Sequence, residues 1–223
     1  MYSRKKAGLL LLCAILLLSV AGCGGVRYNP SVSGIFLRRN YQVIGAEIET
    51  LDNSAYNTER YSADSLREFI ENDVKNFNEK KAGLALAYQD DVQDKNVTTL
   101  PVAIREISYQ ENTARLLLDY SDPESYLEFN DRPLDGGVTN LMIGHVIDLI
   151  DSGTDFSQMQ DPEGNAVSAE EIDRHSQDFI AVVTGGSHVQ VEGKIRFVSA
   201  GVTITSDSEA DTPAEGDSYI IFR

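Results

Sequence analysis

The chain has 223 residues, of which 35 are acidic and 19 are basic, and its formal net charge at pH 7 is −16. A chain this acidic is poorly suited to bind nucleic acid or anionic lipid headgroups by charge. It holds two cysteines, too few for the disulfide framework of a small secreted scaffold. The composition therefore argues against nucleic-acid binding and against a disulfide-stabilised fold.

Residues 1–22 have the pattern of a bacterial export signal. Three basic residues at 4–6 precede an uncharged, leucine-rich run at 7–20. This run is shorter than the roughly 20 apolar residues of a membrane-spanning helix, and its length is typical of the apolar region of a signal peptide. We expect these residues to direct export and to be removed.

Cys23 follows Val20, Ala21 and Gly22, and the four residues together resemble the lipobox of bacterial lipoproteins. The resemblance implies cleavage before Cys23 and a diacylglyceryl group on its sulfur, chemistry for which a nucleophilic thiolate is suited. We therefore expect Cys23 to anchor the chain to the outer face of the bacterial cytoplasmic membrane. The alternative is an ordinary secretory signal followed by a chance cysteine.

Removal of residues 1–22 leaves 201 residues, with 16 basic and 35 acidic side chains and a net charge of −19. Cys13 is lost with the signal and Cys23 is used for lipid, so no thiol remains for a disulfide, a nucleophile or a thiolate metal site. Residues 23–33 are rich in glycine, proline and serine, which predicts a flexible tether. Ten extended residues reach at most ~35 Å, and a single domain over 34–223 follows.

The clearest element of this domain is an amphipathic helix over residues 65–80, which we expect Gly83 to end. Its apolar residues recur at the spacing of one helix face, and they are Leu66, Phe69, Ile70, Val74 and Phe77. Two shorter helices are predicted to begin after the capping residues Asp122 and Ser168.

Strand-like segments account for much of the remaining chain. They are expected at residues 34–37, 41–50, 100–109, 113–120, 179–183, 188–191, 195–198, 202–205 and 219–222. Residues 84–99 are predicted to form a loop, and the acidic residues 206–217 a mobile one. Residues 138–151 are compatible with one buried helix or with a strand to Ile143 and a short helix. Hairpins with helices between them indicate an α+β fold, with amphipathic helices packed on an antiparallel sheet.

No catalytic, metal-binding or cofactor-binding motif stands out in the sequence. Ser187 and His188 lie in GGSH, which resembles a nucleophile elbow, but neighbouring strand residues point to opposite faces. We therefore predict a tight hairpin turn there. His145 and Asp148 can share a helix face, but a lone pair of this kind is usually structural. The acidic stretch 161–171 departs from the EF-hand pattern, so a turn and a capped helix are expected.

Four segments resemble a group of lipoproteins from clostridial gut bacteria to which no activity is assigned. They are SLREFIENDVKNFNE (65–79), SYLEFND (125–131), GKIRFVSAGVTI (193–204) and YIIF (219–222). The resemblance implies a Gram-positive cell surface. We expect a lipid-anchored, extracytoplasmic binding or interaction module, whose partner is an envelope protein or a small ligand. Two alternatives stay open: a cell-wall hydrolase that uses scattered carboxylates, and a structural subunit of an envelope or spore assembly.

Overall fold

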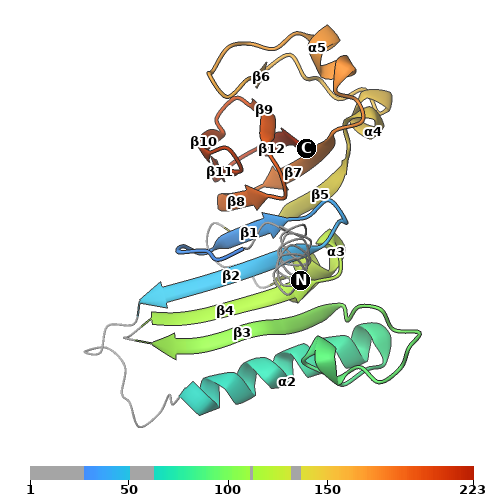
Figure 1. The fold of residues 1–223 in the computed structure, drawn as a ribbon, viewed down its shortest axis with the longest axis vertical. Coiled ribbons are helices and arrows are strands. Elements are labelled where there is room, and N and C mark those ends of the chain that lie inside the picture. The colour runs from blue at the N-terminus through green and yellow to red at the C-terminus, as the bar shows by residue number, and fades with distance from the viewer. Residues whose placement is uncertain (1–27, 51–62, 111–112, 132–136) are drawn as a thin grey trace, which may run out of the picture.

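The computed structural model describes residues 28–50, 63–110, 113–131 and 137–223. The predicted signal peptide, the lipobox and Cys23 lie outside these residues. The described residues form a single-domain α+β fold, with twelve strands in two sheets and four α-helices (Figure 1). The expected fold class is confirmed, and each of the nine expected strands corresponds to a strand of the structure.

The larger sheet has seven strands, which come from residues 34–120 and from residues 187–212. They are β1 (Gly34–Leu37), β2 (Val43–Thr50), β3 (Val102–Gln110), β4 (Thr113–Tyr120), β8 (Ser187–Val191), β10 (Thr203–Ser206) and β11 (Glu209–Thr212). Their order is β10-β11-β8-β1-β2-β4-β3, and β1 and β8 form the parallel pair. A Cβ atom on Gly34 would lie 2.3 Å from the carbonyl oxygen of His188, so this close strand contact requires glycine.

The smaller sheet has five strands, and its neighbours are antiparallel. In spatial order they are β5 (Asn140–His145), β7 (Phe179–Thr184), β12 (Asp217–Phe222), β9 (Ile195–Ser199) and β6 (Met159–Gln160). The chain passes from β7 to β8, and thus from one sheet to the other, through Gly185 and Gly186. The tight hairpin predicted at GGSH is therefore wrong, because the two strands belong to different sheets.

Helix α2 (Ala63–Ala82) lies alongside β3 at the edge of the larger sheet (Figure 1). Val74 is fully buried, whereas Leu66 and Phe69 are 45% and 57% exposed. Only the C-terminal part of the predicted apolar face therefore packs against the protein. Gly83 follows the helix with a positive φ of 72°, as expected for a glycine that ends a helix.

The remaining helices are short. They are α3 (Pro123–Phe129), α4 (Val146–Asp151), α5 (Ala169–Arg174) and the 3-10 helix η2 (Gln89–Asp91). Asp122 and Ser168 cap α3 and α5 as predicted, because their side chains accept hydrogen bonds from the backbone N–H of the third residue on.

One apolar core joins the two sheets. Ile35 and Val43 of the larger sheet and Val183 and Phe222 of the smaller sheet belong to the same buried cluster. A second cluster lies beneath α4, α5 and β6, and it consists of Val146, Phe156, Met159, Ile172, Ile180, Phe197 and Ile221. The shared core explains why the two sheets form one domain, and the second cluster holds α5 against the smaller sheet.

Two segments, residues 138–151 and 206–217, compare differently with their sequence-based predictions. Residues 138–151 form β5 and then α4, so the strand-plus-helix alternative is correct. The acidic loop predicted at 206–217 is wrong, because it contains β11 and the first residue of β12. In β11, Ala210 and Thr212 are buried while Asp211 is exposed. Small residues that point inward alternate here with acidic residues that point outward, as in a strand. The acidic composition of the segment suggested a loop instead.

The described part of the predicted tether is packed against the larger sheet. Tyr28 is 9% exposed and stacks on Phe36, with 5.2 Å between ring centroids. The hydroxyl of Ser33 accepts a hydrogen bond from the backbone N–H of Ile48 at 2.8 Å. From residue 28 onward the chain is therefore held by contacts, which corrects the expectation of a flexible tether up to residue 33.

Candidate functional site

A groove of about 640 Å³ lies between the turn after β6, helix α5 and strands β9 and β10. Its volume falls within the ~300–1,000 Å³ typical of small-molecule sites. The segments that form it come from residues 161–163, 171–175, 194–197 and 204–207. It is thus assembled from parts of the chain that are separate in sequence.

Strand β9 forms one wall of the groove and is fixed at its start. The backbone N–H of Lys194 donates to the carbonyl of Arg223 at 2.9 Å, and that of Ile195 donates to the carbonyl of Asp207 at 2.8 Å. A Cβ atom on Gly193 would lie 2.2 Å from the Arg223 carbonyl oxygen, so glycine permits this close approach. These backbone contacts hold the side chains of β9 in place beside β10.

Helix α5 supplies the opposite wall and fixes His175 at its C-terminal end. Ile172 is 1% exposed and anchors the helix in the second apolar cluster. Nδ1 of His175 lies 2.8 Å from a carboxylate oxygen of Asp178. The imidazole ring also packs edge-on against Phe197, with 5.2 Å between ring centroids. The ring is therefore held from two sides and forms a firm part of the wall.

Most charged groups along the groove already have partners. Lys194 pairs with Asp207 at 2.6 Å, and Glu171 pairs with Arg174. The Asp161 carboxylate accepts hydrogen bonds from the side chain and backbone of Asn165. These hydrogen bonds, the side-chain one above all, lower the pKa of Asp161, because they stabilise its charged form. The acidic stretch 161–171 is therefore explained by a turn and a capped helix, as predicted.

Arg196 is the cation of the groove that has no hydrogen bond or ion pair to another described residue. It is half-buried, and its Nε is shielded from solvent without a hydrogen-bond partner. The buried side-chain atoms without partners in the described part of the chain belong to Tyr28, Ser218 and Arg196, and only Arg196 is a cation. A buried donor left unpaired costs about 1–3 kcal/mol. The two terminal guanidinium nitrogens also have no partner among the described residues but are not shielded from solvent. They are therefore the donors that can bind a carboxylate or another planar acceptor with two parallel hydrogen bonds.

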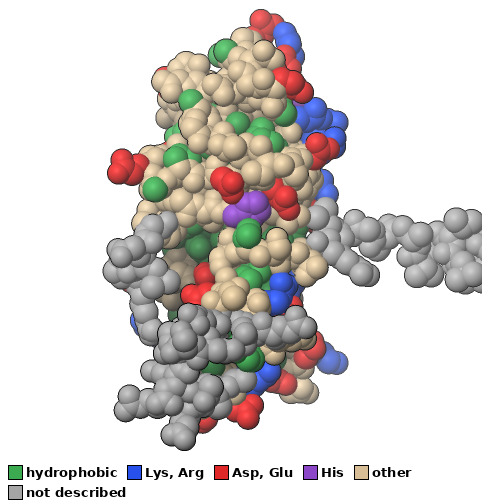
Figure 2. All heavy atoms as spheres, turned by 90° about the vertical axis from the view of Figure 1, so that its left-hand side faces the viewer, with side chains coloured by type: hydrophobic (Ala, Val, Ile, Leu, Met, Phe, Trp, Pro, Cys, Tyr) green, Lys and Arg blue, Asp and Glu red, His purple; other side chains and the backbone are tan. Residues whose placement is uncertain are grey.

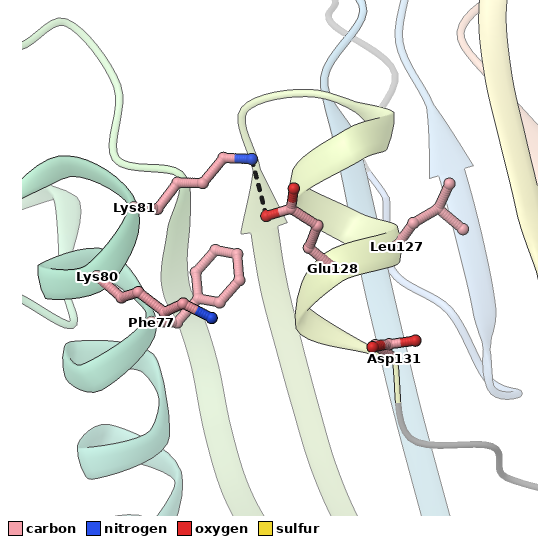
Figure 3. Close-up of a pocket in the computed structure, with 6 residues that line it drawn as sticks. All are labelled: Phe77, Lys80, Lys81, Leu127, Glu128 and Asp131. Carbon is pink, nitrogen blue, oxygen red and sulfur yellow. Dashed lines mark ion pairs between the residues drawn. The ribbon is translucent and has the colours of Figure 1, made fainter.

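A second cavity, of about 550 Å³, lies between α2 and α3. Figure 3 shows Lys81 reaching from α2 toward Glu128 of α3. Lys81 contacts Glu128 at 2.8 Å and Glu124 at 3.1 Å. Because both of these contacts join the two helices, they are explained by helix packing and do not by themselves point to a ligand.

A third cavity, of about 560 Å³, lies between residues 28–33 and strands β8, β10 and β11. His188 and Asp211 line it and pair with each other at 2.7 Å. Figure 2 shows a histidine among acidic side chains on one face of the molecule. Here too the histidine has its own carboxylate partner.

The residues singled out in the sequence do not form an active site together. The hydroxyl of Ser187 donates to the carbonyl of His188 at 3.2 Å, so the two side chains do not pair, as expected. The backbone N–H of His145 donates to Asp148 at 3.1 Å, which caps α4. No group of three or more possible metal ligands occurs in the described residues.

Arg196 was missed because its sequence signal is weak. It is one of two basic residues in the sequence KIRFVS, and arginine residues are mostly exposed. In the structure it lines a groove together with residues of α5 and of the turn after β6, which are distant in sequence. The one available hint was its position between Ile195 and Phe197, both of which are buried.

No family model, no curated protein and no solved structure matches this chain. No helix in the described ranges is long and apolar enough to cross a membrane. The geometry of the groove and the pattern of the first 23 residues are therefore the features that point to a function.

Proposed function

We propose that this chain is a membrane-anchored, extracytoplasmic lipoprotein that acts as a binding module, with the groove as its ligand site. One observation carries the binding function: Arg196 is a half-buried cation without a partner in a groove of about 640 Å³. A protein gains no stability from such a group. A ligand that supplies the missing acceptor gives the arginine a function.

The anchor is supported by the lipobox pattern that ends at Cys23. Only residues 24–27 separate this cysteine from Tyr28, which is packed against the larger sheet. Four residues span at most about 14 Å when extended. An anchored domain would therefore stay close to the membrane surface, with its groove open to the extracytoplasmic space.

The anchor is tested by fractionation and by fatty-acid labelling of cells that express the full chain. We expect Cys23→Ala to abolish incorporation of labelled fatty acid and to release the protein from the membrane fraction. Cys13→Ala is the matched control, because it removes the other cysteine and leaves the lipobox intact. Labelling of the Cys23→Ala variant at the level of the unchanged chain would refute the anchor.

The ligand site is tested by thermal-shift screening of the purified chain against small molecules of varied charge. Glu163 is exposed at the rim of the groove, so Glu163→Trp places a bulky side chain there. Glu215 is exposed in another turn and does not line the groove, which makes Glu215→Trp the matched control. We expect a ligand that stabilises the unchanged chain and the control but not Glu163→Trp.

Three results would count against this function. Equal stabilisation of both tryptophan variants would place the ligand outside the groove. A screen without any stabilising ligand would favour the structural-subunit alternative. Turnover of a cell-wall fragment, lost in the Glu163→Trp variant, would favour the hydrolase.

A further inference from the structure

We infer that the groove binds a short zwitterionic peptide, whose carboxylate is held by Arg196 and whose ammonium group lies at the acidic rim. This inference rests on the proposed binding function and names its ligand class. Three features of the groove carry it: one unpaired guanidinium, an excess of acidic side chains, and apolar side chains between them.

The carboxylate assignment follows from the chemistry of the free guanidinium. Arginine presents its N–H donors as a planar fork, which matches the two oxygens of a carboxylate. Lys194 lies two residues away, but its ammonium group is already 2.6 Å from Asp207. Arg196 is therefore the cation of the groove that has no partner among the described residues.

The charge of the rim selects between possible anions. Four carboxylates line the groove, from Asp161, Glu163, Glu171 and Asp207, against the two permanent cations Lys194 and Arg196. A phosphate or another multiply charged anion would be repelled by this excess of negative charge. A ligand with one carboxylate and one ammonium group would be attracted at both ends.

Glu163 is the acid best placed to receive the ammonium group. Its side chain is exposed at the rim and has no hydrogen bond or ion pair within the described ranges. The other three acids are engaged, with Asn165, Arg174 and Lys194 respectively. One free cation and one free acid thus line the same groove.

The apolar lining accounts for the body of the ligand. Phe197 and Ile195 line the groove from β9 and Ile204 from β10. The volume of about 640 Å³ is that of a site for a drug-sized molecule, which matches a peptide of a few residues. Ile195 and Phe197 are 5% and 8% exposed, so small apolar side chains on such a peptide would mainly contact the partly exposed Ile204.

The inference is tested by isothermal titration calorimetry of the full chain in detergent micelles. The probes are trialanine, its C-terminal amide, its N-acetyl derivative and inorganic phosphate. We expect trialanine to bind, and amidation to weaken binding about ten- to a hundredfold, because it removes a charged hydrogen-bond partner. N-acetylation is expected to weaken binding about two- to tenfold, since the rim is exposed.

Variants assign each end of the peptide to its partner. Arg196→Gln is expected to weaken the binding of trialanine about as much as amidation does. In this variant, amidation of the peptide should have little further effect on binding. Glu163→Gln is expected to remove the effect of N-acetylation in the same way. Arg39 is exposed and has no side-chain partner in the described residues, so Arg39→Gln serves as the matched control with unchanged affinity.

The outcomes separate this inference from the binding function itself. An amidation effect that persists in full in Arg196→Gln would overturn the assignment of the carboxylate. Binding of phosphate without binding of trialanine would overturn the ligand class and leave the groove as a ligand site. The class would also be wrong if the thermal-shift screen found a groove ligand while no peptide bound at millimolar concentration. Absence of any groove ligand in both assays would overturn the binding function as well.

Discussion

Asn78 is a buried polar residue of α2 whose replacement tests how the helix is attached to the sheet. It is 0% exposed. Its Nδ2 donates to the carbonyls of Leu86 and Val102, both at 2.7 Å, and its Oδ1 accepts from the N–H of Val102 at 3.0 Å. One amide thus joins the helix to the loop after it and to the first residue of β3.

The cost of losing this amide follows from its three hydrogen bonds. Each contributes about 1 kcal/mol net, and a buried donor left unpaired costs about 1–3 kcal/mol. We expect Asn78→Ala to lower the free energy of unfolding by about 3–5 kcal/mol, a large part of the ~5–15 kcal/mol of a typical domain. Asn76 is exposed on the same helix, so Asn76→Ala is the matched control and should lose less than about 1 kcal/mol.

Asn78→Asp tests the same contacts through pH. Its carboxylate keeps the acceptor for Val102 but faces two carbonyl oxygens with no donor, so the pKa of the new carboxyl is expected to rise above its ordinary value near 4. The folded variant then prefers the neutral acid, and its stability falls as pH rises from about 4. Urea unfolding followed by circular dichroism measures both effects. A loss in Asn78→Ala within about 1 kcal/mol of Asn76→Ala would refute the reasoning.

Three further predictions concern stability, and the first and the last each compare two variants. Gly34→Ala would place a Cβ atom 2.3 Å from a backbone carbonyl oxygen. We expect it to lower the free energy of unfolding, measured in urea, by more than about 3 kcal/mol. Gly164→Ala, with φ of 85° and open space, should cost about 1 kcal/mol. Burial raises the pKa of Tyr126 to about 12, so stability should fall from about pH 10 to pH 12, and less steeply in Tyr126→Phe. Phe69→Ser, at a 57% exposed position, should change stability by less than about 0.5 kcal/mol, against about 2 kcal/mol for Val74→Ala.

Each of these expectations has a result that would contradict it. Equal losses in the two glycine variants would mean that β1 and β8 separate without much cost. A Tyr126→Phe profile parallel to that of the unchanged chain above pH 10 would mean that the phenol is hydrated. A large loss in Phe69→Ser would mean that the exposed end of α2 is packed against another part of the protein.

Local signals were enough to predict most of the elements. The periodicity of α2 and the side-chain caps at Asp122 and Ser168 depend on residues a few positions apart, and all three agree with the structure. Strands flanked by turn residues were found for the same reason. Residues 138–151 form a short apolar segment that is compatible with the period of a helix and with that of a strand. Only tertiary packing decides between the two.

The division into two sheets depends on contacts that local patterns do not encode. Gly185 looks like part of a hairpin, but its φ of 104° and the close approach of Gly137 send the chain from one sheet to the other. Strand β11 was missed because its acidic residues lie on the solvent face and its buried ones are small. At Gly185 the deciding contact is with Gly137, which is far away in sequence. Strand β11 pairs with its neighbour β10 and also with β8, whose residues lie about 20 positions earlier.

The candidate site could not be predicted from local sequence either. Its central residue, Arg196, lies in a groove that two segments distant in sequence complete. Arg196 lies on β9, and the groove that it lines is completed by α5 and by the turn after β6. The contacts that bury it supply no acceptor for its Nε, so the empty protein carries an unpaired donor that lowers its stability. Sequences rarely keep such a group where an apolar residue would pack better, unless the group has a function. Most residues of the chain suit the element in which they lie, which is why local patterns predict the fold. Arg196 does not suit its half-buried position, and we therefore expect a ligand there.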